Sequence, residues 1–226
     1  MKKQIEKLEV EVEALWQLTM HACGRFAFLK PMMRNKVLLR RIRREQRGEG
    51  FARVRNWLLW GLVLELHKIS SDDDKRTPSI KTITLKLKDA GLRTQLEDTY
   101  AKGNRDVEEA VLRAEFNRLY SKYLRRAKAM LSSQSVRGYR TIRHTRIAHN
   151  QLQKSGSDFF DIKDAKVKFG DERRLLSKLQ GLVKLLLLIV RRVDFDWGTA
   201  VRIEEKAARK FWQLQSPPKQ DKSAAG

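Results

Sequence analysis

The feature that most constrains this chain is the spacing of apolar residues along its first thirty positions. Apolar or small side chains recur three and four residues apart, a period that places them on one face of an α-helix. These positions are Ile5, Leu8, Val12, Leu15, Thr19, Ala22, Phe26 and Leu29. The pattern predicts one long helix that ends at Pro31 and buries this stripe in a core.

The helical period continues through most of the sequence. With Thr77 as the N-cap, Pro78 at the first helical position and Gly91 as the stop, we expect a short helix here, although Ile83, Leu85 and Leu87 also alternate as in a strand. We expect Trp57–Leu66, apolar nearly all round, to lie centrally. The remaining expected helices cover 35–46, 51–69, 106–131, 133–152, 171–193 and 196–214, and Gly48 and Gly50 separate the first two. Ser133 or Ser135 is the expected N-cap of the fourth of these helices, Asp171 of the fifth and Asp196 of the sixth. In the helix over 106–131 we expect the buried residues to include Val107, Val111, Ala114, Leu119 and Met130.

These helices predict an all-α fold, a single bundle of long antiparallel helices over residues 1–214. Residues 215–226 have nothing to bury, so we expect a disordered C-terminal tail there. The two most apolar runs fall short of the roughly 18–20 residues that span a bilayer, and the N-terminus does not resemble a signal peptide. A single cysteine excludes an internal disulfide framework and fits a reducing compartment. We therefore expect a soluble, cytoplasmic protein with no membrane association.

Positive charge is concentrated in one part of the chain. Lys and Arg outnumber Asp and Glu by 49 to 27, which gives a net charge of +22 and favours an anionic partner. From Phe116 to Ser157 there is no acidic residue. A solvated helix face is the alternative reading, but such faces normally mix both signs. We expect nucleic-acid binding by Arg118, Lys122, Arg125, Arg126, Arg137 and Arg140, with Tyr120, Tyr123 and Tyr139 available to stack on unpaired bases.

The acid-free window contains RTIRHTRIAHNQL, residues 140–152. On a helix, Arg143, Arg146 and His149 fan across one side. Imidazoles can transfer the protons that RNA cleavage by a 2′-hydroxyl requires, and guanidiniums can bind the phosphoryl oxygens. His149 also shares an apolar stripe with Ile142, so it could be a core residue. The stripe is consistent with function if it faces a two-fold dimer seam.

The segment IRHTRIAHN resembles the signature of the HEPN superfamily, in which an Arg and a polar residue precede a His after a short spacer. The match is Arg143, then His144, then His149, with five residues between Arg143 and His149. LHKISSDDDKRTPSIKTITLKL and the ending IAHN resemble the AbiU-type abortive-infection branch, and the similarity extends over about 16–193.

The resemblance implies a helical bundle and a metal-independent endoribonuclease without cofactor, whose composite site forms in a homodimer. It implies catalytic roles for Arg143 and His149, with His144 and Arg146 supporting them. The substrate would be RNA, and the protein would act as a toxin or antiphage-defence effector, controlled by an antitoxin or a defence-system partner protein. The alternative is a non-catalytic nucleic-acid-binding or regulatory module of the same fold.

Other candidate sites are weaker. We expect no metal site, because His21 and Cys23 are too few and Asp72–Asp74 lacks the spacing of a calcium loop. His67 follows an apolar helix, and we interpret it as a core or helix-end residue.

Overall fold

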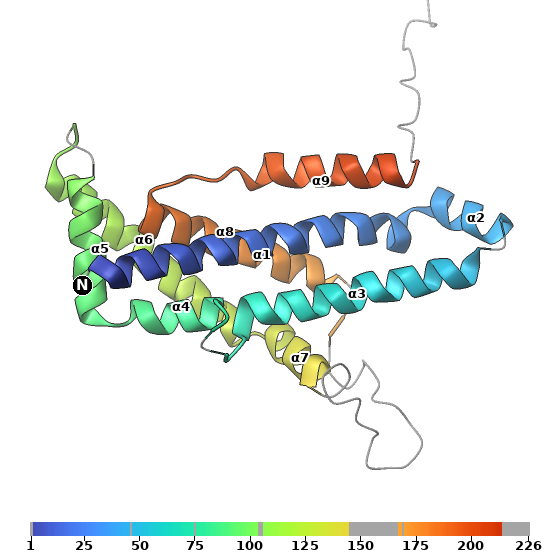
Figure 1. The fold of residues 1–226 in the computed structure, drawn as a ribbon, viewed down its shortest axis with the longest axis horizontal. Helices are drawn as coiled ribbons and strands as arrows, with labels where there is room; N and C mark the ends of the chain where they lie inside the picture. The colour runs from blue at the N-terminus through green and yellow to red at the C-terminus, as the bar shows by residue number, and fades with distance from the viewer. Residues whose placement is uncertain are drawn as a thin grey trace, which may run out of the picture.

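The computed structural model describes residues 2–45, 47–74, 76–103, 106–144, 167–168 and 170–213. Every regular element in these ranges is a helix, which confirms the predicted all-α class (Figure 1). The elements are α1 (Lys2–Arg34), α2 (Lys36–Arg44), α3 (Gly48–Ser71), α4 (Ile80–Leu87), α5 (Ala90–Lys102), α6 (Glu109–Leu131), α7 (Gln134–Ile142), α8 (Asp171–Leu186) with a π-helical extension (Leu187–Arg191), and α9 (Trp197–Phe211). The expected tail, 215–226, lies outside the described residues. No described helix has the length and apolarity that a membrane span requires.

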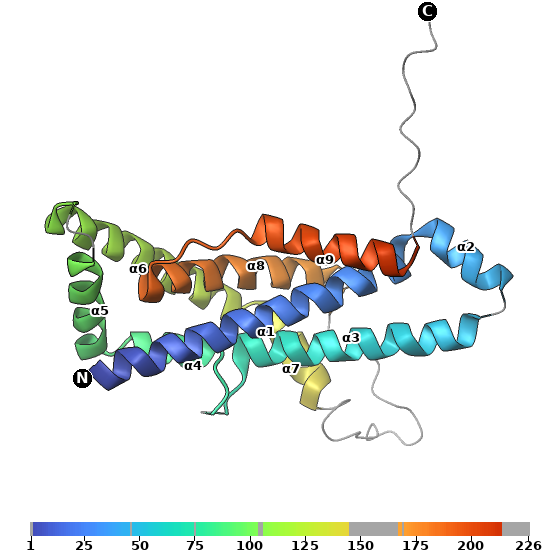
Figure 2. The same ribbon diagram turned by 45° about the horizontal axis from the view of Figure 1, so that its top comes forward.

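Helix α1 lies at the centre of the bundle. It packs against α3, α8 and α9, and Figures 1 and 2 show α3 and α8 running antiparallel to it while α9 runs parallel. The apolar stripe predicted from the sequence is its inward face, since Val12, Leu15 and Leu29 are fully buried. Arg25 of α1 makes two hydrogen bonds to the Glu65 carboxylate of α3, at 3.0 and 2.9 Å. The same helix therefore contributes both core and interhelical ion pairing.

Two predicted helix boundaries were wrong. Pro31 does not end α1, which continues to Arg34. Proline lacks the amide that would bond to the carbonyl four residues earlier, but its own carbonyl can still accept a hydrogen bond. The Pro31 carbonyl accepts one from the Asn35 amide at 2.9 Å. Gly48 and Gly50 lie in the first turn of α3 rather than between helices. Glycine keeps its amide donor and costs a helix only about 1 kcal/mol relative to alanine, so neither residue has to end the helix.

The short helix α4 is confirmed, but its cap was misassigned. Ser79, not Thr77, is the N-cap, and its hydroxyl and that of Thr82 bond reciprocally to each other's backbone amides. Gly91 does not stop a helix, because it lies inside α5, an element that the sequence analysis missed. Asp89 caps α5 by accepting a hydrogen bond from the Leu92 amide at 2.8 Å.

Helix α6 turns a different face inward from the one predicted. Val107, Val111 and Ala114 are exposed, whereas Leu119 and Met130 are buried as expected. Helix α6 packs against α5, α8 and α4, and its buried face comprises Leu112, Phe116, Leu119, Tyr120, Tyr123, Ala127 and Met130.

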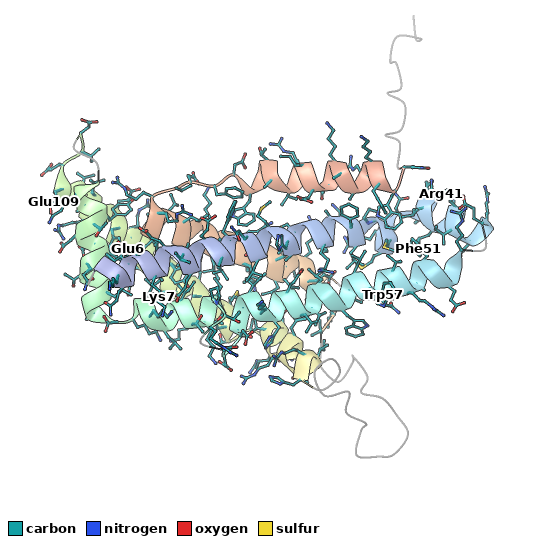
Figure 3. The ribbon with its side chains drawn as sticks, in the orientation of Figure 1. Glu6, Lys7, Arg41, Phe51, Trp57 and Glu109 are labelled. Carbon is teal, nitrogen blue, oxygen red and sulfur yellow. The ribbon has the colours of Figure 1, made fainter. Side chains whose placement is uncertain are left out.

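Helix α3 is only half central. Leu62 and Leu66 are fully buried, but Trp57 is 71% exposed. The start of α3 and α2 together project beyond the rest of the bundle (Figure 2), and Trp57 is labelled on the N-terminal half of α3 (Figure 3). The apolar run therefore buries only its C-terminal half, which leads toward the candidate site described below.

The last two helices are capped differently from one another. Gly170, with φ of 102°, is the N-cap of α8, so Asp171 is the first helical residue and not the predicted cap. Asp196 is the cap of α9, as predicted, and accepts a hydrogen bond from the Thr199 amide at 3.2 Å.

Aromatic residues attach both ends of α9 to α1. Phe195, just before α9, packs edge-on against Trp16 with ring centroids 5.2 Å apart. At the other end, the indole Nε1 of Trp212 donates to the Phe28 carbonyl at 3.1 Å, and Arg41 donates to the Trp212 carbonyl at 2.9 Å. Helix α9 is thereby fixed along the side of α1 away from α7 (Figures 1 and 2).

Candidate functional site

Helix α7 carries the start of the motif found in the sequence. It begins after Ser133 and buries Val136, Tyr139 and Ile142, while Arg137 and Arg140 on its other face are exposed. This apolar face packs against α3, α6 and α8. The period of the buried residues therefore directs the arginines outward, which is the orientation that binding an anion requires.

The end of α7 places the first two motif residues together. Arg143 and His144 continue the helix in a wider π-type turn, and both are partly exposed. The other two predicted site residues, Arg146 and His149, lie outside the described residues. The described site is therefore a guanidinium next to an imidazole.

A second imidazole lies beside this pair. His67, near the C-terminal end of α3, is 3% exposed, which confirms the expectation of a core or helix-end residue. Its ring centroid is 6.0 Å from that of His144, with the rings at 84° to one another. Nothing in the sequence connects these two histidines, because helical periodicity does not encode which distant helices cross.

Burial and the charges around it keep His67 neutral. Burial, followed by the nearby Arg143 guanidinium, lowers the pKa of His67 from its ordinary 6.5 to about 4, and Asp72 opposes this only in part. His144 and Arg140 act in the same direction as Arg143. At neutral pH this corner therefore contains an uncharged imidazole under a group of cationic or titratable α7 residues.

The acidic loop after α3 contacts the same helix. The Asp73 carboxylate bonds to Lys81 of α4 and lies 3.4 Å from Nη2 of Arg140. The hydrogen bond from Lys81 is the main cause that lowers the pKa of Asp73, and Arg140 contributes. Arg140, predicted to bind nucleic acid, is therefore paired with a carboxylate, although its side chain remains 53% exposed.

The other predicted basic residues occupy the outer faces of α6 and α7. Arg125, Arg126 and Arg137 are exposed, Lys122 is partly exposed, and Arg118 faces Glu115 at 3.9 Å. Between α6 and α8 there is a cavity of about 330 Å³ lined by Arg126, Ala129, Met130, Ser177, Lys178, Gly181 and Leu182. Lys178, which the sequence analysis did not single out, thus faces the same space as Arg126.

The three tyrosines proposed to stack on bases cannot do so. Tyr120, Tyr123 and Tyr139 are at most 5% exposed. Tyr120 donates its hydroxyl to the Leu87 carbonyl, and the hydroxyl groups of Tyr123 and Thr84 are 2.8 Å apart. Burial raises the pKa of both Tyr123 and Tyr139. These residues are core, because their spacing follows the buried face of each helix rather than the basic one.

Among the described residues, no three His, Cys, Asp or Glu side chains come close enough to hold a metal ion. Cys23 is buried, and burial raises the pKa of its thiol to about 11. The chemistry available at the described site is therefore that of guanidinium and imidazole groups, which bind anions and transfer protons.

Comparison with known protein families gives a match over most of the chain. The family model described as AbiU2, a HEPN family, matches residues 5–211. This range includes every described helix apart from the first few residues of α1. No curated protein and no solved structure matches the chain.

Proposed function

Since the chain belongs to the AbiU2 family of HEPN domains, we propose that it is a metal-independent endoribonuclease that acts in abortive infection, as a toxin or an antiphage-defence effector. The observation that carries this proposal is the placement of Arg143 and His144 at the exposed end of α7, beside a buried neutral imidazole. These are the first two residues of the HEPN signature. His149, the third, follows with five residues between it and Arg143.

The reaction that these groups support is an internal transesterification. A base removes the proton of a ribose 2′-hydroxyl, the resulting oxygen attacks the adjacent phosphorus, and an acid protonates the 5′-oxygen that leaves. We assign proton transfer to His149 and binding of the phosphoryl oxygens to Arg143, with His144 and Arg146 in support. The products would be a 2′,3′-cyclic phosphate and a 5′-hydroxyl, and no metal is required.

The basic surface supports RNA as the substrate. Arg125, Arg126 and Arg137 are exposed on the helices that lead to the site, and Lys178 lies opposite Arg126. Exposed cations next to one another neutralise successive phosphates without reading sequence. We therefore propose that RNA binds along α6 and α7 mainly through its backbone.

A homodimer would complete the site. Helix α3, which carries His67, also exposes Val54, Trp57 and Leu64 on its outer face. Large exposed apolar groups close together are typical of a protein–protein contact. We propose that a second copy covers this row, bringing two α7 ends toward a shared cleft. Control by an antitoxin or another defence-system protein, in the cytoplasm, is part of the same proposal.

The decisive experiment incubates purified protein with RNA in EDTA and identifies the product ends. Cleavage that leaves 2′,3′-cyclic phosphate supports the proposal, and cleavage that appears only after adding magnesium or manganese contradicts it. His149→Ala should reduce kcat by roughly 10²–10⁴-fold with little change in RNA affinity. His21→Ala, on an exposed position of α1, is the matched control and should cleave normally.

One observation favours a second function. The basic surface of α6 is complete without any histidine, so it could bind RNA in a non-catalytic regulatory module. RNA binding without cleavage, unchanged in His149→Ala, would support this module and exclude the enzyme.

A further inference from the structure

We propose that His67 is a positioning residue of the Arg143–His144 site, a buried imidazole on α3 that fixes the orientation of the His144 ring. This role rests on the proposed function, because positioning matters for rate only if the site cleaves RNA. His67 lies in the segment LHKISSDDD, outside both the Arg143–His149 signature and the acid-free window, and it precedes both in the sequence.

The geometry gives His67 a fixed place beneath the site. Its backbone lies in the well-packed end of α3, where Leu66 and Ile69 are fully buried. The Ser70 hydroxyl donates to the His67 carbonyl at 3.2 Å. The residue is 3% exposed, and its ring meets that of His144 edge to face with centroids 6.0 Å apart. The partly exposed His144 imidazole at the end of α7 thus packs against the buried His67 imidazole, which has little freedom to move.

The charges at this corner explain why an imidazole suits the position. From α7, Arg143, His144 and Arg140 face His67. From its own helix end Asp72 faces it, and Asp73, bonded to Lys81 of α4, lies close enough for His67 to influence its titration. A permanent cation in place of His67 would be repelled by Arg143.

A neutral imidazole provides contact without adding charge. It has one donor and one acceptor nitrogen, so it can hold a neighbouring ring in one orientation while remaining uncharged. An apolar side chain of similar size could fill the same volume but could not hydrogen-bond. This difference separates a positioning role from a packing role, and it can be measured.

The kinetic test compares His67→Gln with His67→Phe. Phe fills the space without polar groups, whereas Gln offers a donor and an acceptor. We expect kcat to fall on the order of 10- to 100-fold in His67→Phe, with KM unchanged and part of the rate restored in His67→Gln. Ile69→Val, a buried substitution two residues away on α3, controls for general loosening of the core and should keep the wild-type kcat. Wild-type kcat in a folded His67→Phe protein would overturn the proposal.

A second measurement does not depend on catalysis. The imidazole ¹H–¹³C signals of the histidines are assigned by single substitutions and titrated with pH. In both His67 variants the position and titration of the His144 signal should change, while those of His21 should not. If His67→Phe does not fold, the His144 signal in His67→Gln alone tests the proposal. An unchanged His144 signal overturns the positioning role, whereas absence of RNA cleavage by the wild type would refute only the proposed function.

Discussion

The Asp73 carboxylate lies 3.4 Å from the Arg140 guanidinium, so the loop after α3 partly neutralises the face of α7 that leads to Arg143. The same carboxylate bonds to Lys81, which connects α4 to α7 through one residue. This contact sets how much of the positive charge near the site is available to a phosphate.

The first prediction concerns this contact. Asp73→Asn should strengthen RNA binding, because it releases Arg140 to neutralise a phosphate. The slope of log K against log salt should steepen by about 0.7 if one contact to single-stranded RNA is gained. Fluorescence anisotropy at several salt concentrations measures both effects.

Asp74→Asn is the matched control. It changes the net charge equally, but Asp74 pairs with Arg76 and not with Arg140. Equal effects of the two substitutions would show that only overall charge matters.

The second prediction is a pH dependence of stability. The pKa of His67 is lowered to about 4 in the folded protein, from an ordinary 6.5, so only the unfolded chain binds this proton between these values. Stability from this group is complete above about pH 6.5 and is lost as the pH falls toward 4. The loss should be roughly 3 kcal/mol. Chemical denaturation at a series of pH values measures it.

His67→Gln removes the titrating group and serves as the reference. As the pH falls, the wild type should lose unfolding free energy through His67 while this variant does not, so the variant should become more stable relative to the wild type. A difference that stays constant from pH 7 to pH 4 would mean that His67 titrates alike in both states.

The third prediction separates the causes of that shift. Arg143→Gln should raise the pKa of His67 above 4, because Arg143 is its largest charged cause, but burial should keep the pKa below 6.5. Arg140→Gln should raise it less, since Arg140 is the weakest of the named causes. An NMR titration of the His67 ring distinguishes the two variants, and a larger effect of Arg140→Gln would contradict this order of causes.

The fourth prediction uses two adjacent serines. The Ser71 hydroxyl is buried and has no hydrogen-bond partner in the part of the chain that the structure describes. Ser71→Ala should therefore raise the free energy of unfolding by about 1 kcal/mol. Ser70→Ala removes a buried hydrogen bond to the His67 carbonyl and should be less stable than Ser71→Ala. If Ser70→Ala proves at least as stable as Ser71→Ala, the Ser71 hydroxyl does have a hydrogen-bond partner.

Much of the helical architecture could be predicted because one period encodes both helix and buried face. This succeeded for α1, where the stripe is uninterrupted. It failed at Gly91, where glycine was interpreted as a stop although Asp89 before it and the spacing of Leu92 and Leu96 indicate a new helix. It failed also at Val111, where several apolar residues compete for the inward face and only tertiary packing decides.

The site was less predictable than the fold. Arg143 and His144 could be found from a local signature, because both lie on one turn of one helix. The proximity of His67 could not, because it depends on how α3 crosses α7. The buried tyrosines were misinterpreted for a related reason, since a tyrosine between arginines has the same sequence signature whether it points inward or outward.

The attachment of α9 has a practical consequence for labelling. Aromatic contacts at Trp16 and Trp212 hold this helix on the side of α1 away from α7, and Ile203 in its middle is 62% exposed. A cysteine at position 203 would carry a fluorophore or a surface tether without contacting the Arg143–His144 corner. The native Cys23 is buried, and the raised pKa of its thiol leaves little reactive thiolate, so it should react slowly with the label. Single molecules could then be immobilised through α9 with the Arg143–His144 corner left open to solution.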